Sequence, residues 1–387
     1  MNVVDLLTKL VSFDSLFEHE KAVMEWVETY AKKLGLDTNR LSIAENRFNL
    51  LIERGGPTTL LCYGHIDTVP VYQGWNTEPF TLTPDGDRLY GLGSCDMKGG
   101  IAAMLSAIEQ LPKDIPIKLL LAVDEENDSA GAWHVVNERS DWLKDITHVI
   151  SGEPGASATK IGGVDVLTLG RRGRARYNVR VHGVSAHGGH IERGASAISL
   201  ATALVQKIEA MELAEHQHLS KASHYVARID GKSKGLSLPE YCEFEIDRHL
   251  VLPETSESAL KQYRKLCDAF IGELEIPLAL KRKISIDIEL KPRENPYMEA
   301  YETPQNDQVA QLAMRIMKNY SKQIVINYGR SVGDENVFAD TKGIKPIILG
   351  PEGANIHSAN EYVSRESLET CVDIYRELLI AHNDSKG

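Results

Sequence analysis

The sequence has no uninterrupted apolar run of about 18 residues, the length that a membrane-spanning helix needs. Asp5 and Lys9 break the apolar stretch at the N-terminus, which argues against a signal peptide. The chain also lacks an excess of basic residues, because 43 Lys and Arg stand against 55 Asp and Glu, a formal net charge of −12. Nucleic acids and anionic membranes are bound through basic patches, so we expect neither as a partner.

Cysteine is scarce as well. The five cysteines are an odd number, lie far apart and form no C-x-x-C pair. This usage indicates buried free thiols in a reducing cytosol rather than a disulfide framework or a cysteine metal site. We therefore expect a cytoplasmic protein.

The length and the apolar pattern predict two domains. A chain of 387 residues exceeds one ordinary domain. The first 170 residues or so alternate helical patterns with short runs that are apolar on both faces, which is typical of a parallel or mixed sheet covered on both sides. The segments 174–181, 242–247 and 284–290 instead alternate apolar and polar residues, which predicts antiparallel strands with one solvated face.

The apolar-strand pattern returns after about residue 290. We therefore expect an α/β domain formed by residues 1–172 and 291–387, with an α+β domain inserted at 173–290.

Acidic residues and histidines follow the apolar strands of the first domain. The carboxyl ends of strands line the ligand crevice of an open α/β sheet, so residues distant in the sequence can converge there. Five candidate metal ligands follow strands or precede a helix in this way: His65, Asp96, Glu126, Glu153 and His357. So many carboxylates in one crevice would repel each other unless a cation neutralised them. Imidazole together with carboxylate suits Zn²⁺ or a similar ion.

Two short motifs suggest different roles for residues that are neighbours in the sequence. In extended backbone, His65 and Asp67 point the same way, so Asp67 can hold the second ring nitrogen of His65 or a neighbouring group. Glu125 and Glu126 face opposite ways, so one can bind metal while the other faces substrate. A free carboxylate beside activated water is the expected general base of a hydrolase.

These motifs resemble those of the M20 group of metallo-hydrolases, which includes acetylornithine deacetylases, succinyl-diaminopimelate desuccinylases, aminoacylases and related carboxypeptidases. The group's pattern of H-x-D, G-x-G-x-x-D-x-K-G, E-E, E-P and a late His corresponds here to GHIDTVP, GLGSCDMKGG, DEEN, SGEP and NIHSANE. The resemblance covers nearly the full length. It implies a zinc-hydrolase-type mixed sheet covered by helices, with an inserted α+β lid or dimerisation domain.

The resemblance also implies a role for each ligand. Asp96 would bridge two metal ions, zinc or cobalt, with a cis peptide after it. His65 and Glu153 would complete the shell of one ion, and Glu126 with His357 that of the other. Glu125 would be the general base, and Asp67 would orient a ligand.

In the inserted domain, the resemblance implies that His187 steadies the oxyanion and that Arg248 holds a substrate carboxylate. It also implies a homodimer formed through this domain. Two departures affect the substrate: Leu236 stands where many relatives have Asn, and His187 is followed by Gly-Gly-His. We expect Arg330 and Asp334 to contact ligand from the loop at 329–336.

The expected function is metal-dependent hydrolysis of N-acyl amino acids, with an exopeptidase or dipeptidase acting on small peptides as the alternative. A serine hydrolase is a rival because 329–333 reads G-x-S-x-G around Ser331. In the sequence, Ser331 and His357 are too close to leave room for the helix and strands that normally separate such a serine from its catalytic histidine. A serine hydrolase would also leave the clustered carboxylates unexplained. A non-catalytic binding module is disfavoured because every proposed ligand and the base are present.

Overall fold

The computed structural model describes residues 1–154 and 164–384. The chain forms two compact units. The first comprises Met1–Arg171, Glu302–Gly329 and Gly333–Gly387, and the second comprises Arg172–Tyr301 and Arg330–Val332. The chain returns to the first unit later than the expected residue 291, because the segment after residue 290 still pairs within the second unit, where Arg174 N donates to Met298 O at 2.9 Å.

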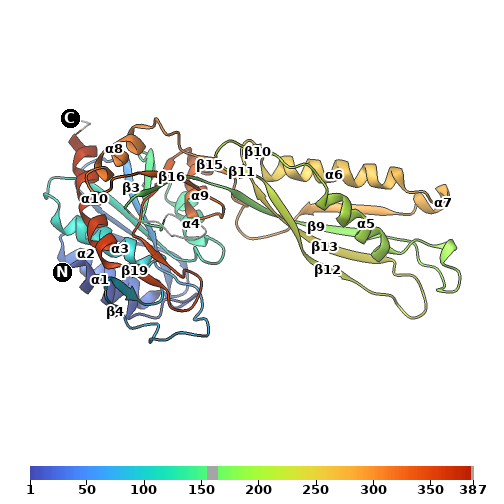
Figure 1. Cartoon of the computed structure of the whole chain (residues 1–387), viewed down its shortest axis with the longest axis horizontal. Helices are drawn as coiled ribbons and strands as arrows, with labels where there is room; N and C mark the ends of the chain where they lie inside the picture. The colour runs from blue at the N-terminus through green and yellow to red at the C-terminus, as the bar shows by residue number, and fades with distance from the viewer. Residues whose placement is uncertain (155–163, 385–387) are drawn as a thin grey trace. The chain divides into compact units, whose positions relative to one another are not determined.

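A mixed sheet forms the centre of the first unit (Figure 1). Its order is β1 (Asp37–Ala44), β2 (Arg47–Arg54), β6 (Ile117–Ala122), β3 (Leu60–His65), β7 (His148–Ser151), β17 (Lys345–Ile348), β8 (Val166–Arg171) and β15 (Tyr301–Glu302), and β16 (Val325–Gly329) also pairs with β8. Strand β3 runs parallel to both of its neighbours, β6 and β7. These three strands therefore end at the same edge of the sheet.

Both faces of this sheet are buried, as the apolar runs predict. In β3, Leu60 and Cys62 join one core, which also contains helices α1 (Val3–Val11), α2 (Lys21–Lys33), α3 (Lys98–Gln110), α8 (Gln308–Met317) and α10 (Arg365–Asp384). Tyr63 points to the opposite face, because side chains alternate along a strand, and its ring meets Phe338 with centroids 5.4 Å apart. Phe338 belongs to α9 (Asp334–Lys342), which packs with α4 (Ala130–Glu138).

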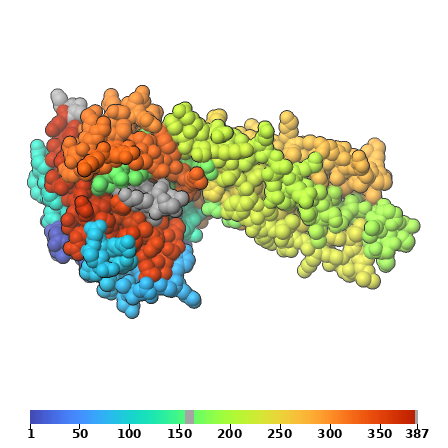
Figure 2. Space-filling view, viewed as in Figure 1, coloured from blue at the N-terminus to red at the C-terminus, as the bar shows by residue number. Residues whose placement is uncertain are grey.

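A second, small sheet brings together two distant parts of the first unit. It consists of β18 (Gly353–Ala354), β19 (Tyr362–Ser364), β5 (Arg88–Tyr90) and β4 (Thr83–Asp85). On the face seen in Figure 2, light-blue atoms of the early chain lie beside orange and red atoms of the late chain. The unit is thus assembled from both ends of the sequence.

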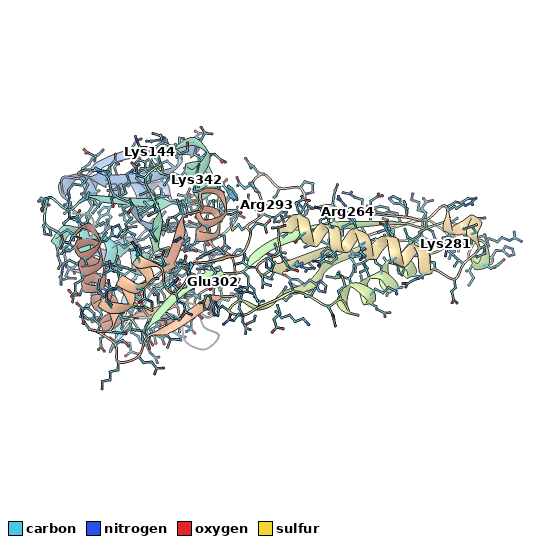
Figure 3. The ribbon with its side chains drawn as sticks, turned by 90° about the horizontal axis from the view of Figure 1, so that it is seen from above. Lys144, Arg264, Lys281, Arg293, Glu302 and Lys342 are labelled. Atoms are coloured by element: carbon cyan, nitrogen blue, oxygen red, sulfur yellow. The ribbon has the colours of Figure 1, made fainter. Side chains whose placement is uncertain are left out.

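The second unit has a four-stranded antiparallel sheet in the order β12 (Ser223–Gly231), β13 (Tyr241–Leu250), β9 (Gly173–His182) and β14 (Ser285–Leu290). Buried and partly exposed residues alternate along β9, as predicted. Helices α5 (Ala197–Glu209) and α6 (Ser256–Glu273) share its core. Figure 3 labels Arg264 on α6 and Lys281 on α7 (Leu278–Lys281). Within the described residues, no helix combines the length and the apolar character needed to cross a bilayer.

Asp307 connects two strands and a helix at one edge of the sheet. This edge is opposite the one where the strands end in acidic residues. Its carboxylate accepts from the backbone of Val309 at 2.9 Å and so caps α8. It also pairs with His148 at the start of β7, at 3.0 Å, and with Lys345 at the start of β17, at 2.9 Å. Burial would raise the pKa of Asp307, but the hydrogen bonds from Lys345 and His148 outweigh it and lower the pKa to about 2.

We predict that Asp307→Ala lowers the free energy of unfolding by about 1–2 kcal/mol at pH 7, because it removes a cap and two ion pairs. Asp307→Asn keeps a capping side chain and should cost less. A carboxylate whose pKa is lowered by folding stabilises the protein above the unfolded pKa of about 4, so the gap between wild type and Asp307→Asn should close as the pH falls from about 4 towards 2. Urea unfolding at several pH values measures this difference in the free energy of unfolding. A difference that widened in acid would contradict the stabilising role of the ionised Asp307.

Candidate metal centre

The parallel strands at the centre of the first unit carry the predicted site residues at their carboxyl ends. His65 is the last residue of β3, Glu125 and Glu126 follow β6, and Glu153 follows β7. Asp96 lies just before α3 and joins them because α3 packs closely on the loop after β7. A Cβ added at Gly100 would lie 2.1 Å from Gly152 O, so only glycine permits this approach.

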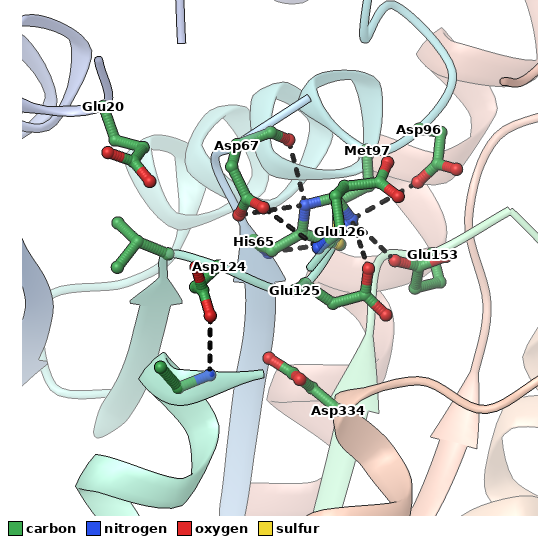
Figure 4. A network of polar contacts seen from close by, with 12 residues as sticks. Glu20, His65, Asp67, Asp96, Met97, Asp124, Glu125, Glu126, Glu153 and Asp334 are labelled. Atoms are coloured by element: carbon green, nitrogen blue, oxygen red, sulfur yellow. Dashed lines mark hydrogen bonds and ion pairs between the residues drawn. The ribbon is translucent and has the colours of Figure 1, made fainter. Parts of the chain in front are cut away.

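His65 is the centre of one half of the cluster (Figure 4). Its Nε2 lies 2.9 Å from Glu153 Oε1 and 3.3 Å from Asp96 Oδ1. Glu125 is farther away, with its Oε2 at 3.9 Å. The His65 side chain is fully buried, so its ring is fixed by these partners and by its strand.

His357 is the centre of the other half. Its Nε2 lies 3.0 Å from Glu126 Oε2 and 3.4 Å from Asp96 Oδ2. The two oxygens of Asp96 thus face two different imidazoles, as a bridging carboxylate would. His357 has a positive φ of 54°, in a loop where Asn355 and Asn360 also have positive φ. Such a backbone is unfavourable for a non-glycine residue and occurs often at functional sites.

The ligand atoms lie close enough together to hold metal. Atoms of His65, Glu125 and Glu153 lie within 4.8 Å of one another, and so do atoms of His65, Asp96 and Glu126. The first set includes Glu125, which we expect to be the base. The shorter distance from His65 to Glu153 than to Glu125 favours Glu153 as the ligand.

The electrostatics of the cluster fit a bound cation. Burial raises the pKa of Glu153 to about 7, with the nearby Asp96 pushing in the same direction, and burial raises the pKa of Glu125 well above its usual range. Burial opposes a charge on His65, but the surrounding carboxylates outweigh it and raise its pKa. Hydrogen bonds to Asp96 and Glu126 raise the pKa of His357 to about 11. Without another cation, protons on the imidazoles and on the raised-pKa carboxyls offset the negative charge, whereas with one the imidazoles can be neutral ligands.

Asp67 supports both halves. Its carbonyl oxygen lies 3.1 Å from His65 Nδ1, and its carboxylate Oδ1 lies 3.5 Å from the same nitrogen. Its other carboxylate oxygen accepts from the backbone N–H of Glu126 at 3.0 Å. Asp67 therefore contacts one candidate ligand, His65, at its ring and another, Glu126, at its backbone, as a residue that orients metal ligands would.

The sequence reasoning missed two buried arginines that hold the cluster. Arg171 lies 3.5 Å from Glu153 Oε2 and 3.0 Å from the fully buried Glu335. Arg47 joins Glu20, at 2.5 Å, to Asp124, at 3.0 Å. Since Asp124 directly precedes Glu125 and has a φ of 75°, this pair fixes the turn that carries Glu125 and Glu126.

A further missed residue, Glu361, supports Asp96. Its buried carboxylate accepts from three backbone N–H groups of the loop that ends in Asp96, and this loop continues into a cis Asp96–Met97 peptide bond. Burial raises the pKa of Glu361 to about 8. The hydrogen bonds that its two oxygens accept from the backbone N–H groups oppose this rise without cancelling it. The one feature of the sequence that could have indicated a role for Glu361 is its position four residues after the candidate ligand His357.

Asp334 lies in the same network as Glu125 (Figure 4). It begins α9, is 1% exposed, and accepts a hydrogen bond from the hydroxyl of Tyr63. Burial raises its pKa to about 7. Its predicted contact with substrate stays a prediction.

The other predicted residues, His187, Arg248 and Arg330, belong to the second unit. His187 is exposed, and its Nδ1 accepts from Gly189 N at 3.1 Å, so the proton of the neutral ring lies on Nε2. Arg248 is fully buried, pairs with Glu254 and lies over the ring of Tyr263 at 5.3 Å. To hold a substrate carboxylate, Arg248 would have to leave this partner.

A mixed sheet with two imidazoles, a shared carboxylate and a further carboxylate beside them defines the class of metal-dependent hydrolases. The chain belongs to peptidase family M20/M25/M40, whose pattern matches residues 61–381.

Relatives and solved structures agree with this assignment. The chain is 24% identical over 383 residues to a succinyl-diaminopimelate desuccinylase of Nautilia profundicola, covering 98% of this chain and 99% of that protein. It is 28% identical over 360 residues to a desuccinylase of Nitrosospira multiformis, covering 89% of each. An aminopeptidase structure from Bacillus cereus has a TM-score of 0.80 at 19% identity, covering 99% of this chain and 98% of that one. A dinuclear metal-binding M20 peptidase from Bacillus subtilis has a TM-score of 0.72 at 14% identity, covering 98% and 97%.

We predict that Arg47→Met destabilises the first unit by about 3–5 kcal/mol, because it leaves Glu20 and Asp124 buried without their cation. Activity should fall as well, since the turn that carries Glu125 loses its support. Urea unfolding and initial rates measure the two effects. Arg40→Met is the matched control, because Arg40 is 43% exposed and its loss should cost about 1 kcal/mol or less. Equal losses in the two variants would contradict the prediction.

Proposed function

We propose that the protein hydrolyses the amide bond of N-acyl amino acids at a centre formed by one or two divalent ions. The observation that carries the proposal is the placement of Asp96, whose two oxygens face His65 and His357 with Glu125 beside them. His65 with Glu153 would hold one ion, Glu126 with His357 the other, and Asp96 both. Zinc and cobalt suit the same donors, and the ion, when bound, supplies Lewis acidity and makes water acidic enough to lose a proton near neutral pH.

Glu125 has the position and the chemistry of the general base. It is close to the ligands without being the nearest carboxylate to His65, and its side chain is 15% exposed, so water and substrate can reach it. Burial raises its pKa, which makes its carboxylate a stronger proton acceptor. Glu125 takes a proton from the attacking water and delivers it to the leaving nitrogen, and the second proton of the water follows, so that water and amide become a carboxylate and an ammonium group. His187, a donor through Nε2, is the proposed oxyanion contact.

The substrate class rests on relatives. Those named above are desuccinylases, which favours an N-acyl amino acid, while the aminopeptidase fold neighbour supports exopeptidase activity on small peptides as the alternative. Leu236, which is 82% exposed, stands in place of a polar residue and leaves the acyl group open. All five cysteines lie in the described residues as buried free thiols, which fits a reducing cytoplasm.

The decisive experiment measures primary-amine release from N-acetyl and N-succinyl amino acids and from dipeptides, with added zinc or cobalt, with a chelator, and with a fluorophosphonate. We expect turnover that the chelator alone abolishes. The best substrate distinguishes a deacylase from a peptidase. Turnover abolished only by the fluorophosphonate would overturn the proposal in favour of Ser331.

Glu125→Gln should lower kcat by about 10²- to 10⁴-fold, because the amide cannot accept the proton, while bound metal stays at the wild-type level. Ser331→Ala is the control and should keep wild-type activity. An active Glu125→Gln enzyme that retains its metal would refute the assignment of the base.

We further propose that the protein forms a homodimer through its second unit. Strand β12 lies at the edge of the sheet and exposes Tyr225 and Ile229, at 51% and 50%. Such an edge is a template for pairing with another chain.

Ile229→Lys should shift the mass measured by light scattering from dimer to monomer, because the charge would be buried in the interface. Leu278→Lys, at a 60% exposed position of α7, is the control and should leave the mass unchanged, because α7 leads into β14 at the other edge of this sheet. A wild-type protein that is monomeric at all concentrations would contradict the proposal.

A further inference from the structure

Glu361 joins two segments that lie far apart in the sequence. Its Oε2 accepts from Gly93 N at 2.8 Å, and its Oε1 accepts from Cys95 N at 2.8 Å and from Asp96 N at 2.9 Å. Its backbone carbonyl accepts from Gly91 N at 3.0 Å. The side chain is nearly inaccessible, since the residue is 1% exposed.

The ladder between β5 and β19 does not account for these bonds. It pairs Tyr90 with Tyr362 and stops there, so residues 91–96 run beyond it. Glu361 continues the connection with its side chain, up to the backbone N–H of Asp96. Four residues before Glu361, the same loop carries His357, the other imidazole that Asp96 faces.

We propose that Glu361 is a positioning residue that sets where the Asp96 carboxylate stands between the two imidazoles, and thereby how tightly the ion at Asp96, Glu126 and His357 is held. The inference rests on the metal centre proposed above. Glu361 itself is no ligand, because its oxygens are taken by backbone N–H groups.

The other half of the centre has supports of its own. Glu153 is held by Arg171, which in turn pairs with Glu335, and His65 is the end of a central strand. A change at Glu361 should therefore act mainly on the ion at Asp96, Glu126 and His357.

Glu361→Gln tests this with little change of shape. An amide nitrogen cannot accept from an N–H group, so the variant loses at least one of the three bonds and sets two donors against each other. Altering a group that orients a metal ligand commonly weakens metal binding about 10- to 100-fold. We expect one of two zinc affinities to fall by at least about tenfold, and to fall more than the other.

The measurement is a zinc titration of chelator-treated protein in competition with a chromophoric chelator, repeated with cobalt to follow its visible absorption. Asp307→Asn is the matched control: it alters another buried carboxylate, at the opposite edge of the sheet, and should bind metal as wild type does. Two wild-type affinities in Glu361→Gln would overturn the inference, as would an equal fall of both affinities. Wild-type protein that binds no metal would overturn the proposed centre itself and this inference with it.

Glu361→Asp serves if Glu361→Gln does not fold. It keeps the charge and both acceptor oxygens but withdraws them by one methylene. The same zinc affinity should fall, by a smaller factor, and unchanged affinities would overturn the inference.

Discussion

The crowding of buried carboxylates at the ends of β3, β6 and β7 is the constraint on which the rest of the first unit depends. Removing a carboxylate from water is costly unless a cation or several N–H donors compensate it. Three of these acidic residues are compensated in this way: Glu153 by His65 and Arg171, Asp124 by Arg47, and Glu126 by His357. A divalent ion would relieve the charge that remains between them.

Much of this arrangement could be predicted from the sequence. Apolar runs that end in His or in acidic residues place those residues at one edge of a parallel sheet, and β3, β6 and β7 are indeed neighbours. His357 is different: the sequence made it a candidate ligand after an apolar strand, but it lies in a loop after β18 rather than directly at a strand end. The alternation of apolar and polar residues likewise anticipated the second unit's sheet, with Ala175 and Tyr177 buried.

The supporting residues could not be predicted in the same way, because their partners lie far away in the sequence. Glu18 and Glu20 look alike in the sequence, yet Glu20 is fully buried against Arg47. Arg248 is an exception, because its even position places its side chain on the same side of β13 as those of Phe244 and Ile246, which is the apolar side. Period two alone therefore places it inward, and it is indeed fully buried.

The two halves of the centre also differ in their access to solvent. The His65 side chain is fully buried, and those of Asp96 and Glu126 are 9% and 10% exposed, whereas that of His357 is 52% exposed. The proposed centre is therefore more open on the His357 side, where this candidate ligand lies in a loop with a positive φ, than on the side of the sheet. The half around His65 is held by a central strand and by the buried Arg171. The half around His357 needs a support that leaves its exposed surface free. Glu361 provides one, because its buried carboxylate binds the backbone N–H groups of Cys95 and Asp96.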